Sequence, residues 1–308
     1  MTTYSPGVST ATFYERSNHH LASLRARADA LQASISTGQK LTKGSDDPIA
    51  VARLRLLGRA DASALIDTSL SAAATTDLSL TDDTLTSFGD AVIRIKELAV
   101  QAANGILTAG QRAGIATELG QIGSELVRLA NTRDSAGHAL FGGNTAGAAY
   151  TLDASGNPVY AGTASASDLP LGDGQTVTRG LTGPEFLNFT GPSGATNLFA
   201  VVKTLSDALA GAVPDPAQAA RDALGTLDTG LETITTQQTV IGARLNWIDL
   251  NIERQVQMSQ QRSAEEAAVG GTDLSLTVSQ LQQTMTVLEA SQASFARLAG
   301  LSLFTLLR

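Results

Sequence analysis

Three histidines are the side chains most able to bind a metal or transfer a proton near neutral pH. His19 and His20 are adjacent in a segment with helical periodicity, so they point in different directions and cannot readily share a metal ion. His138 stands alone beside a glycine-rich turn. We interpret all three as surface or capping residues.

Two pairs of carboxylates, Asp46–Asp47 and Asp82–Asp83, could supply an acid and a base. We interpret both pairs as residues at helix starts, where a carboxylate caps free N–H groups and favours the helix dipole. The pairs therefore predict helix boundaries and no catalysis.

Two loops contain parts of ligand-binding motifs. The stretch "FGGNTAG", which begins at Phe141, lacks the Lys-Ser/Thr end of a phosphate-binding loop. Asp153, Ser155 and Asn157 have the spacing of a calcium loop, but the closing Glu is missing. No Ser or Thr lies in a nucleophile-elbow sequence. The sequence predicts no enzyme, no cofactor and no metal site.

The stretch "GSDDPIAVARL", residues 44–54, predicts a joint between two helices. Asp46 and Asp47 can accept hydrogen bonds from a first helical turn, and Pro48 suits the first helical position. Gly38, shortly before them, can end the preceding helix in the left-handed conformation. Asp46, Asp47 and Pro48 are our helix-joint residues.

Apolar residues at helical spacing define the helices on both sides of that joint. The first helix carries the stripe Leu21, Leu24, Ala28, Leu31 and Ile35. A helix runs from the joint towards Asn104, and a third helix follows. Near the other chain end a heptad pattern runs from Leu224 to Ile252, and Asp273 then starts a last helix. The stripe of that helix includes Leu274, Val278, Leu281, Met285, Leu288 and Phe295.

Residues 136–197 have a different composition, rich in Gly, Pro, Asn and Asp with short β-favouring runs such as "YTL" and "QTVT". We predict a mainly α, elongated fold of coaxial antiparallel coiled-coil layers formed by both chain ends, with this β-rich insertion at the tip. The predicted domains are 1–44 with 270–308, 45–135 with 198–269, and 136–197. The first of these should be disordered in the monomer.

Composition restricts the function. The net charge of −8 argues against nucleic-acid binding, which requires a basic face. No apolar run could span a bilayer, and no secretory signal begins the sequence. The chain has no cysteine, which fits a reducing cytosol, chance, or a protein transported unfolded. We expect a cytoplasmic protein or one exported without a cleaved signal.

The order of these elements, with Ser36–Gly38, Ser45–Ala50 and Phe141–Gly142, resembles the bacterial flagellin superfamily across essentially the whole chain. The motif with Pro48 and the insertion are similar to its hook–filament junction branch. The terminal "LLR" is similar to flagellins, so a filament subunit is the alternative. A cytoplasmic coiled-coil adaptor is a further alternative, which the presence of the protein in sheared flagella would exclude.

The resemblance implies a structural subunit that the flagellar type III apparatus exports to the extracellular flagellum. The implied partners are further copies in a ring, a neighbouring hook-associated protein, flagellin and an export chaperone. The implied assembly interface consists of apolar residues of the two terminal stripes: Leu21, Leu24, Leu31, Ile35, Leu274, Val278, Leu281, Met285, Leu288 and Phe295.

Overall fold

The computed structural model describes residues 6–41, 43–134 and 136–306 of the chain. Long helices dominate it, which confirms the mainly α fold class. The chain forms two compact units: residues 1–63 with 257–308, and residues 64–256. The finer division into three domains stays a prediction. In the described part of the chain, no helix is long and apolar enough to cross a membrane.

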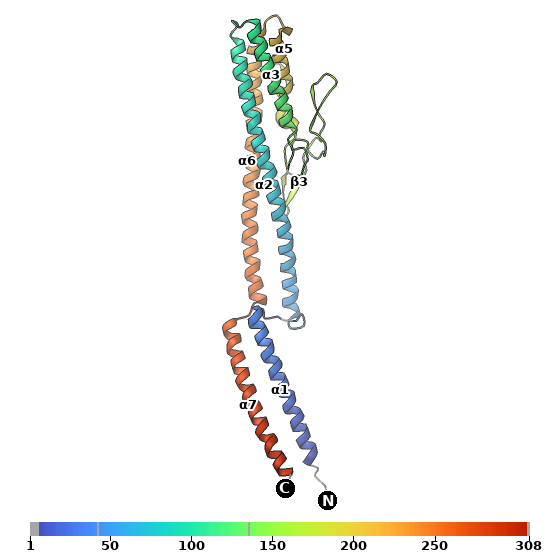
Figure 1. Ribbon diagram of the computed structural model, residues 1–308, viewed down its shortest axis with the longest axis vertical. Coiled ribbons are helices and arrows are strands. Elements are labelled where there is room, and N and C mark those ends of the chain that lie inside the picture. Colours follow the sequence, from blue (N-terminus) through green and yellow to red (C-terminus); the bar gives the residue numbers. More distant parts are fainter. Residues whose placement is uncertain (1–5, 42, 135, 307–308) are drawn as a thin grey trace. The chain divides into compact units, whose positions relative to one another are not determined.

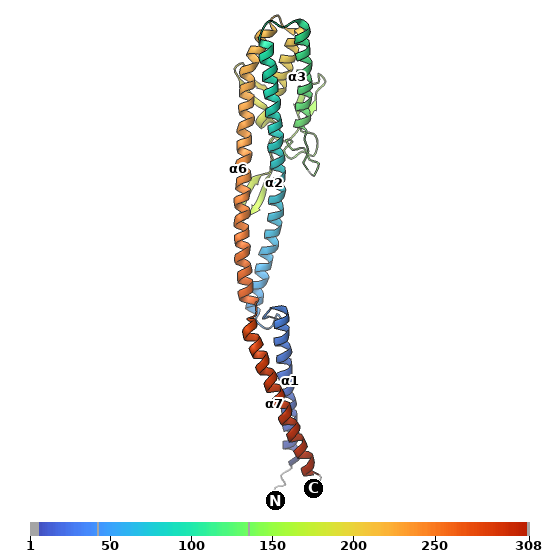
Figure 2. The same ribbon diagram turned by 60° about the vertical axis from the view of Figure 1, so that its left-hand side comes forward.

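The first unit pairs the two ends of the chain. Helix α1 (Pro6–Thr37) and helix α7 (Leu274–Leu306) lie side by side and run in opposite directions (Figures 1 and 2). On α1 the predicted stripe faces this pairing, with Ala28 only 6% exposed. At the far end of the pair, the rings of Tyr14 and Phe295 meet edge to face at 5.5 Å between centroids.

The same unit contains the beginning of helix α2 (Pro48–Ala103) and the end of helix α6 (Pro216–Gly270). Two ion pairs join these helix ends. The Nε and Nη2 groups of Arg53 donate to the two carboxylate oxygens of Glu265, at 2.5 and 2.9 Å. Arg262 binds Asp61 at 2.5 Å, and the Arg262 side chain is only 14% exposed. These ion pairs add to the apolar packing at this end of α2 and α6, where Leu57 is 5% exposed.

In the second unit, α2 and α6 pack together and are covered by helix α3 (Ala109–Ala130), helix α5 (Leu198–Asp207) and the π-helical turn η1 (Ala208–Ala212). The predicted heptad is clear on α6, because residues seven apart are fully buried: Leu227, Ile234, Ile241 and Ile248.

The middle of α2 looks only faintly amphipathic in the sequence because small and polar residues occupy its buried face. Ser71, Ala74 and Thr81 are at most 1% exposed. The Thr81 hydroxyl donates to the carbonyl of Asp77 at 2.8 Å, so it is satisfied within its own helix. The buried face of α2 is therefore formed here by small side chains and not by a stripe of large apolar residues.

The insertion folds as three hairpins with one short helix. Strands β1 (Tyr150–Leu152) and β2 (Pro158–Tyr160) pair, as do β3 (Asp168–Gly172) with β4 (Gln175–Thr178) and β5 (Asn188–Gly191) with β6 (Gly194–Asn197). All three pairs are antiparallel. Helix α4 (Gly183–Leu187) precedes β5. The predicted strands at "YTL" and "QTVT" are confirmed.

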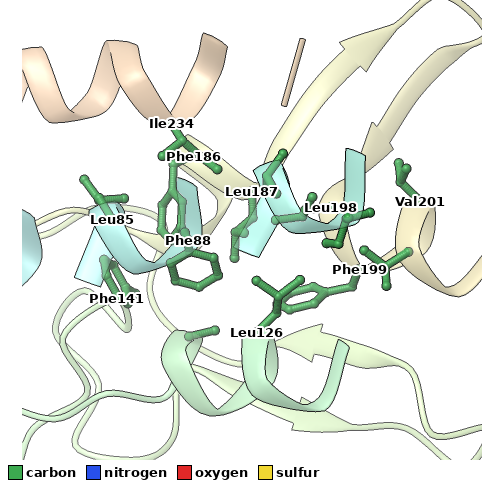
Figure 3. Close-up of a cluster of buried hydrophobic side chains, with 14 of the residues drawn as sticks. Leu85, Phe88, Leu126, Phe141, Phe186, Leu187, Leu198, Phe199, Val201 and Ile234 are labelled. Atoms are coloured by element: carbon green, nitrogen blue, oxygen red, sulfur yellow. The ribbon is translucent and has the colours of Figure 1, made fainter. Parts of the chain in front are cut away.

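The insertion packs along the helices and shares their core, so its predicted place at the tip is corrected. Phe141 and Phe186 lie against Phe88 of α2, with ring centroids 6.2 and 5.0 Å away (Figure 3). The carbonyl of Leu171 accepts a hydrogen bond from the buried Asn251 side chain of α6 at 3.2 Å. Three two-stranded sheets cannot form a core alone, and burial against α2 and α6 supplies one.

Candidate assembly surface

The predicted C-terminal stripe on α7 divides into two sets. Leu281, Leu288 and Phe295 turn towards α1, and Leu288 is only 8% exposed. Four apolar residues of α1 are half-buried in the same seam: Leu21, Leu24, Leu31 and Ile35. The structure therefore brings seven of the ten predicted interface residues together within one chain.

The side chains of the other three predicted interface residues are exposed to solvent. Leu274, Val278 and Met285 are 52%, 39% and 43% exposed. Positions four and eleven residues after Leu274 recur on one side of a helix with 3.6 residues per turn. That side adjoins the one covered by α1. The apolar band on α7 is thus wider than the surface that α1 covers.

The seam between α1 and α7 also contains polar residues that the sequence patterns did not identify. Thr277 and Thr284 on α7 are each 7% exposed. Their hydroxyls donate to the carbonyls of Asp273 and Gln280, at 2.6 and 2.7 Å. A search for regularly spaced apolar residues misses such positions. Because Thr277 and Thr284 occupy part of the side of α7 that faces α1, some of the apolar residues lie on an adjoining side of the helix.

The helix joint is held by main-chain contacts between the two connections. Gly38 has φ of 70°, and its N–H donates to the carbonyl of Ser34 at 2.9 Å, which confirms the predicted left-handed end of α1. Lys40 N–H donates to the carbonyl of Gly270 at 2.7 Å, and Thr272 N–H donates to that of Gly38 at 3.0 Å. We call this pair of hydrogen bonds the backbone clasp.

The three helix-joint residues have separate roles. Asp47 Oδ1 accepts from the N–H groups of Ile49 and Ala50 at 3.1 and 3.0 Å, so Asp47 caps α2. Pro48 is the first residue of α2, as predicted. Asp46 Oδ2 instead accepts from the N–H of Lys43 at 2.8 Å and closes the turn before the helix.

On the other side of the joint, Asp273 caps α7 by accepting from Leu276 N–H at 3.0 Å. Gly271 takes part in an antiparallel bridge with Gln39. A Cβ at Gly271 would lie 2.3 Å from the carbonyl oxygen of Ala267, so only glycine fits there. The sequence showed a break at "VGGTD" but not this close approach.

The main buried charge cluster lies in the second unit. Arg179 binds Asp77 and Asp134 at 3.0 and 3.2 Å, and these carboxylates are only 9% and 7% exposed. Burial by itself raises the pKa of Asp134. Hydrogen bonds from the N–H groups of His138 and Ala136 and the charges of His138 and Arg179 outweigh it, so the pKa of Asp134 lies below its usual value. The cluster joins Arg179 of the insertion to α2 and to the loop that follows α3.

The residues considered for metal binding lie at separate places in the structure. His138 lies 3.5 Å from Asp134 at the surface, and His19 and His20 are exposed on α1. In the β1–β2 turn, Asp153 Oδ1 accepts from the N–H groups of Ser155 and Asn157, each at 2.8 Å. Hydrogen bonds from Asn157 hold the pKa of Asp153 below its usual value.

One boundary prediction is wrong. Asp82 and Asp83 lie in the middle of α2, not at a helix start, because α2 continues without a break from Pro48 to Ala103. Over residues 6–41, 43–134 and 136–306, no group of three or more His, Asp or Glu side chains could hold a metal ion.

Comparisons with known proteins agree with this architecture. Residues 8–146 match the family model described as bacterial flagellin N-terminal helical region. Hook-associated protein 3 of Escherichia coli (strain K12) is 27% identical over 318 residues, covering 97% of this chain and 98% of that protein. Its counterpart from Salmonella typhimurium is also 27% identical, over 98% of this chain and 99% of that protein.

Among solved structures, one described as a flagellar hook-associated protein from Vibrio parahaemolyticus superposes with a TM-score of 0.67. It is 25% identical and covers 73% of this chain and 100% of that one. By its sequence and its fold, the chain is similar to proteins of the flagellin superfamily, among them flagellar hook-associated protein 3.

Proposed function

We propose that this chain is a structural subunit of the bacterial flagellum, forming the junction between a neighbouring hook-associated protein and the flagellin filament. The apolar band on α7, which α1 covers on one side only, carries the proposal. The chain would assemble into a ring when neighbouring subunits bury the open side. The likeness to hook-associated protein 3 along nearly the whole chain supports this assignment.

The energy of such a contact follows from exposed area. Leu274, Val278 and Met285 are each about half exposed. Burying what remains of each side chain contributes about 1 kcal/mol. A contact of this size is weak for one pair of subunits, but a closed ring repeats it at every interface. The terminal helices therefore suit a protein that assembles only where neighbours are already in place.

We further propose that the flagellar type III apparatus exports the chain to the extracellular flagellum, without a cleaved signal and with an export chaperone. The absence of cysteine from the sequence is compatible with transport as an unfolded chain. An open apolar band on α7 before assembly is a surface that a helical chaperone could cover.

The assembly surface can be tested with two matched double variants. Val278→Ser with Met285→Ser alters the open side of the predicted stripe. Leu276→Ser with Val287→Ser alters a different side of α7, where these residues are 56% and 42% exposed. We expect the first variant to leave cells without filaments and with flagellin in the medium, and the second to build normal filaments. Equal filament assembly by both variants would contradict the proposed surface.

The location of the protein separates a junction subunit from a filament subunit. Immunogold labelling of sheared flagella should mark one end of each filament, in a copy number typical of a ring. Labelling along the whole filament would show that the chain is flagellin. Recovery of the chain only from the cytosol would contradict both and favour the coiled-coil adaptor.

A further inference from the structure

The turn between α2 and α3 contains an Asn-Gly pair that is open to solvent. Helix α2 ends at Ala103, and the next three residues, Asn104, Gly105 and Ile106, are exposed. Gly105 has φ of 63°, and nothing lies within 4 Å of the position that a Cβ would take. Within the described part of the chain, the Asn104 side chain and the Gly105 N–H take part in none of the hydrogen bonds of this turn.

We propose that Asn104 is a site of spontaneous deamidation. The main-chain nitrogen of Gly105 attacks Cγ of Asn104, forms a new C–N bond and closes a five-membered succinimide, while the side-chain amide leaves as ammonia. Water then opens the ring at either carbonyl and leaves aspartate or isoaspartate. Water is the only co-reactant, and no electrons are transferred. Glycine favours the attack because it has no Cβ beside the nitrogen.

The local structure distinguishes Asn104 from other asparagines. The Asn131 side chain accepts from Tyr150 N–H at 2.9 Å and donates to Tyr150 carbonyl oxygen at 3.0 Å. Asn144 accepts from Ser167 N–H at 3.0 Å. Both precede threonine, whose branched side chain hinders its own main-chain nitrogen. Neither side chain can reach the attacking geometry without losing these hydrogen bonds.

The reaction would alter a connection that is fixed on both sides. Arg221 of α6 donates to the carbonyl of Ala103 at 2.9 Å, which anchors the end of α2. Thr108 and Gln111 form a capping box that anchors the start of α3. Isoaspartate lengthens the main chain between these anchors by one methylene. The new carboxylate also lies at the C-terminal end of α2, where the helix dipole disfavours negative charge.

The test is peptide mass mapping of the full-length folded protein after incubation in mildly alkaline buffer. The peptide with Asn104 should gain the mass of an amide-to-acid conversion, in aspartate and isoaspartate forms. Its modified fraction should be on the order of ten times that of the Asn131 and Asn144 peptides, because only Asn104 precedes glycine. The protein unfolded in urea serves as the reference for an unprotected Asn-Gly pair.

A matched variant, Asn104→Gln, keeps the amide but requires a larger ring. Acidic species that appear on ion exchange for the parent should be absent for Asn104→Gln under the same incubation. Modification of Asn104 in urea but not in the folded protein would overturn the proposal, because the fold would then protect the turn. Acidic species that persist in Asn104→Gln at the parent level would also overturn it.

Discussion

Removing Arg179 should destabilise the second unit in a way that depends on pH. Arg179→Met keeps the aliphatic stem but leaves Asp77 and Asp134 facing each other. Both carboxylates contact the same guanidinium nitrogen, at 3.0 and 3.2 Å, so their oxygens are at most about 6 Å apart. At an effective dielectric constant of about 20, two charges at that distance repel by about 3 kcal/mol.

The exposure of the cluster sets the expected size of the effect. Removing one partner from a fully buried pair costs about 3–5 kcal/mol, whereas an exposed pair contributes about 0–1 kcal/mol. Here the carboxylates are buried but the Arg179 side chain is 43% exposed. We therefore expect the free energy of unfolding near pH 7.5 to fall by about 2–3 kcal/mol.

The pH dependence follows from the pKa of Asp134. In the parent, the pKa of Asp134 in the folded state is lowered. The contribution of Asp134 to the free energy of unfolding is therefore fully present above its ordinary pKa of about 4, and it is lost as the pH falls through the lowered pKa. Without Arg179, we expect burial and the nearby Asp77 carboxylate to outweigh the N–H groups of His138 and Ala136, and so to raise the pKa of Asp134 above that value. The variant then loses stability as the pH rises through the raised pKa. Its deficit should be largest near neutral pH and smaller near pH 5.

Urea unfolding followed by tryptophan fluorescence is the appropriate assay, because the single tryptophan, Trp247, lies in the same unit. Arg128→Met is the control: Arg128 pairs with the exposed Glu125 on α3, and its loss should cost less than about 0.5 kcal/mol. Equal losses for the two variants, or a loss for Arg179→Met that does not change between about pH 7.5 and pH 5, would refute the reasoning.

Four further predictions concern the first unit. Asp47→Ala should lower the free energy of unfolding by about 1 kcal/mol through loss of the helix cap, whereas Pro48→Ala should change it little yet let flagellin leak into the medium. Normal filaments with Pro48→Ala would show that the proline is incidental. Gly271→Ala should cost about 1–3 kcal/mol because its Cβ meets a carbonyl oxygen, and Gly44→Ala, with open space around it, is the matched control in the same melt. Hydrogen exchange of the free monomer should show residues 1–42 and 272–308 unprotected, and full protection at low concentration would exclude disorder there. A small helical chaperone should bind the parent in a pull-down but not the triple serine variant of Leu281, Met285 and Leu288; undiminished binding would place its site elsewhere.

The sequence was most informative where one periodicity dominates. Leu227 and its heptad partners on α6 are buried as predicted, because seven-residue spacing keeps one face on the partner helix. Asp47, Pro48 and Asp273 marked helix starts because capping is local chemistry. The prediction of a helix start at Asp82 and Asp83 was wrong because, in the sequence, a pair of carboxylates within a long helix cannot be distinguished from a pair at its start.

Features formed by distant segments could not be predicted. The burial of Thr277 depends on α1, and the need for glycine at 271 depends on how the chain turns out of α6. The cluster of Arg179 joins residues from three parts of the chain. Periodicity also could not reveal which side of α7 is covered, because that side depends on where α1 approaches.

The pairing of α1 with α7 has a consequence for synthesis as well as for assembly. A ribosome makes α1 first and α7 last, so the Leu21–Ile35 stripe has no intramolecular partner until translation is nearly complete. The hydrogen bonds of the backbone clasp form equally late, because they join segments more than two hundred residues apart in the sequence. Any prematurely terminated product therefore presents an unpaired α1. The α1–α7 pair can therefore form within one chain only after α7 has been synthesised.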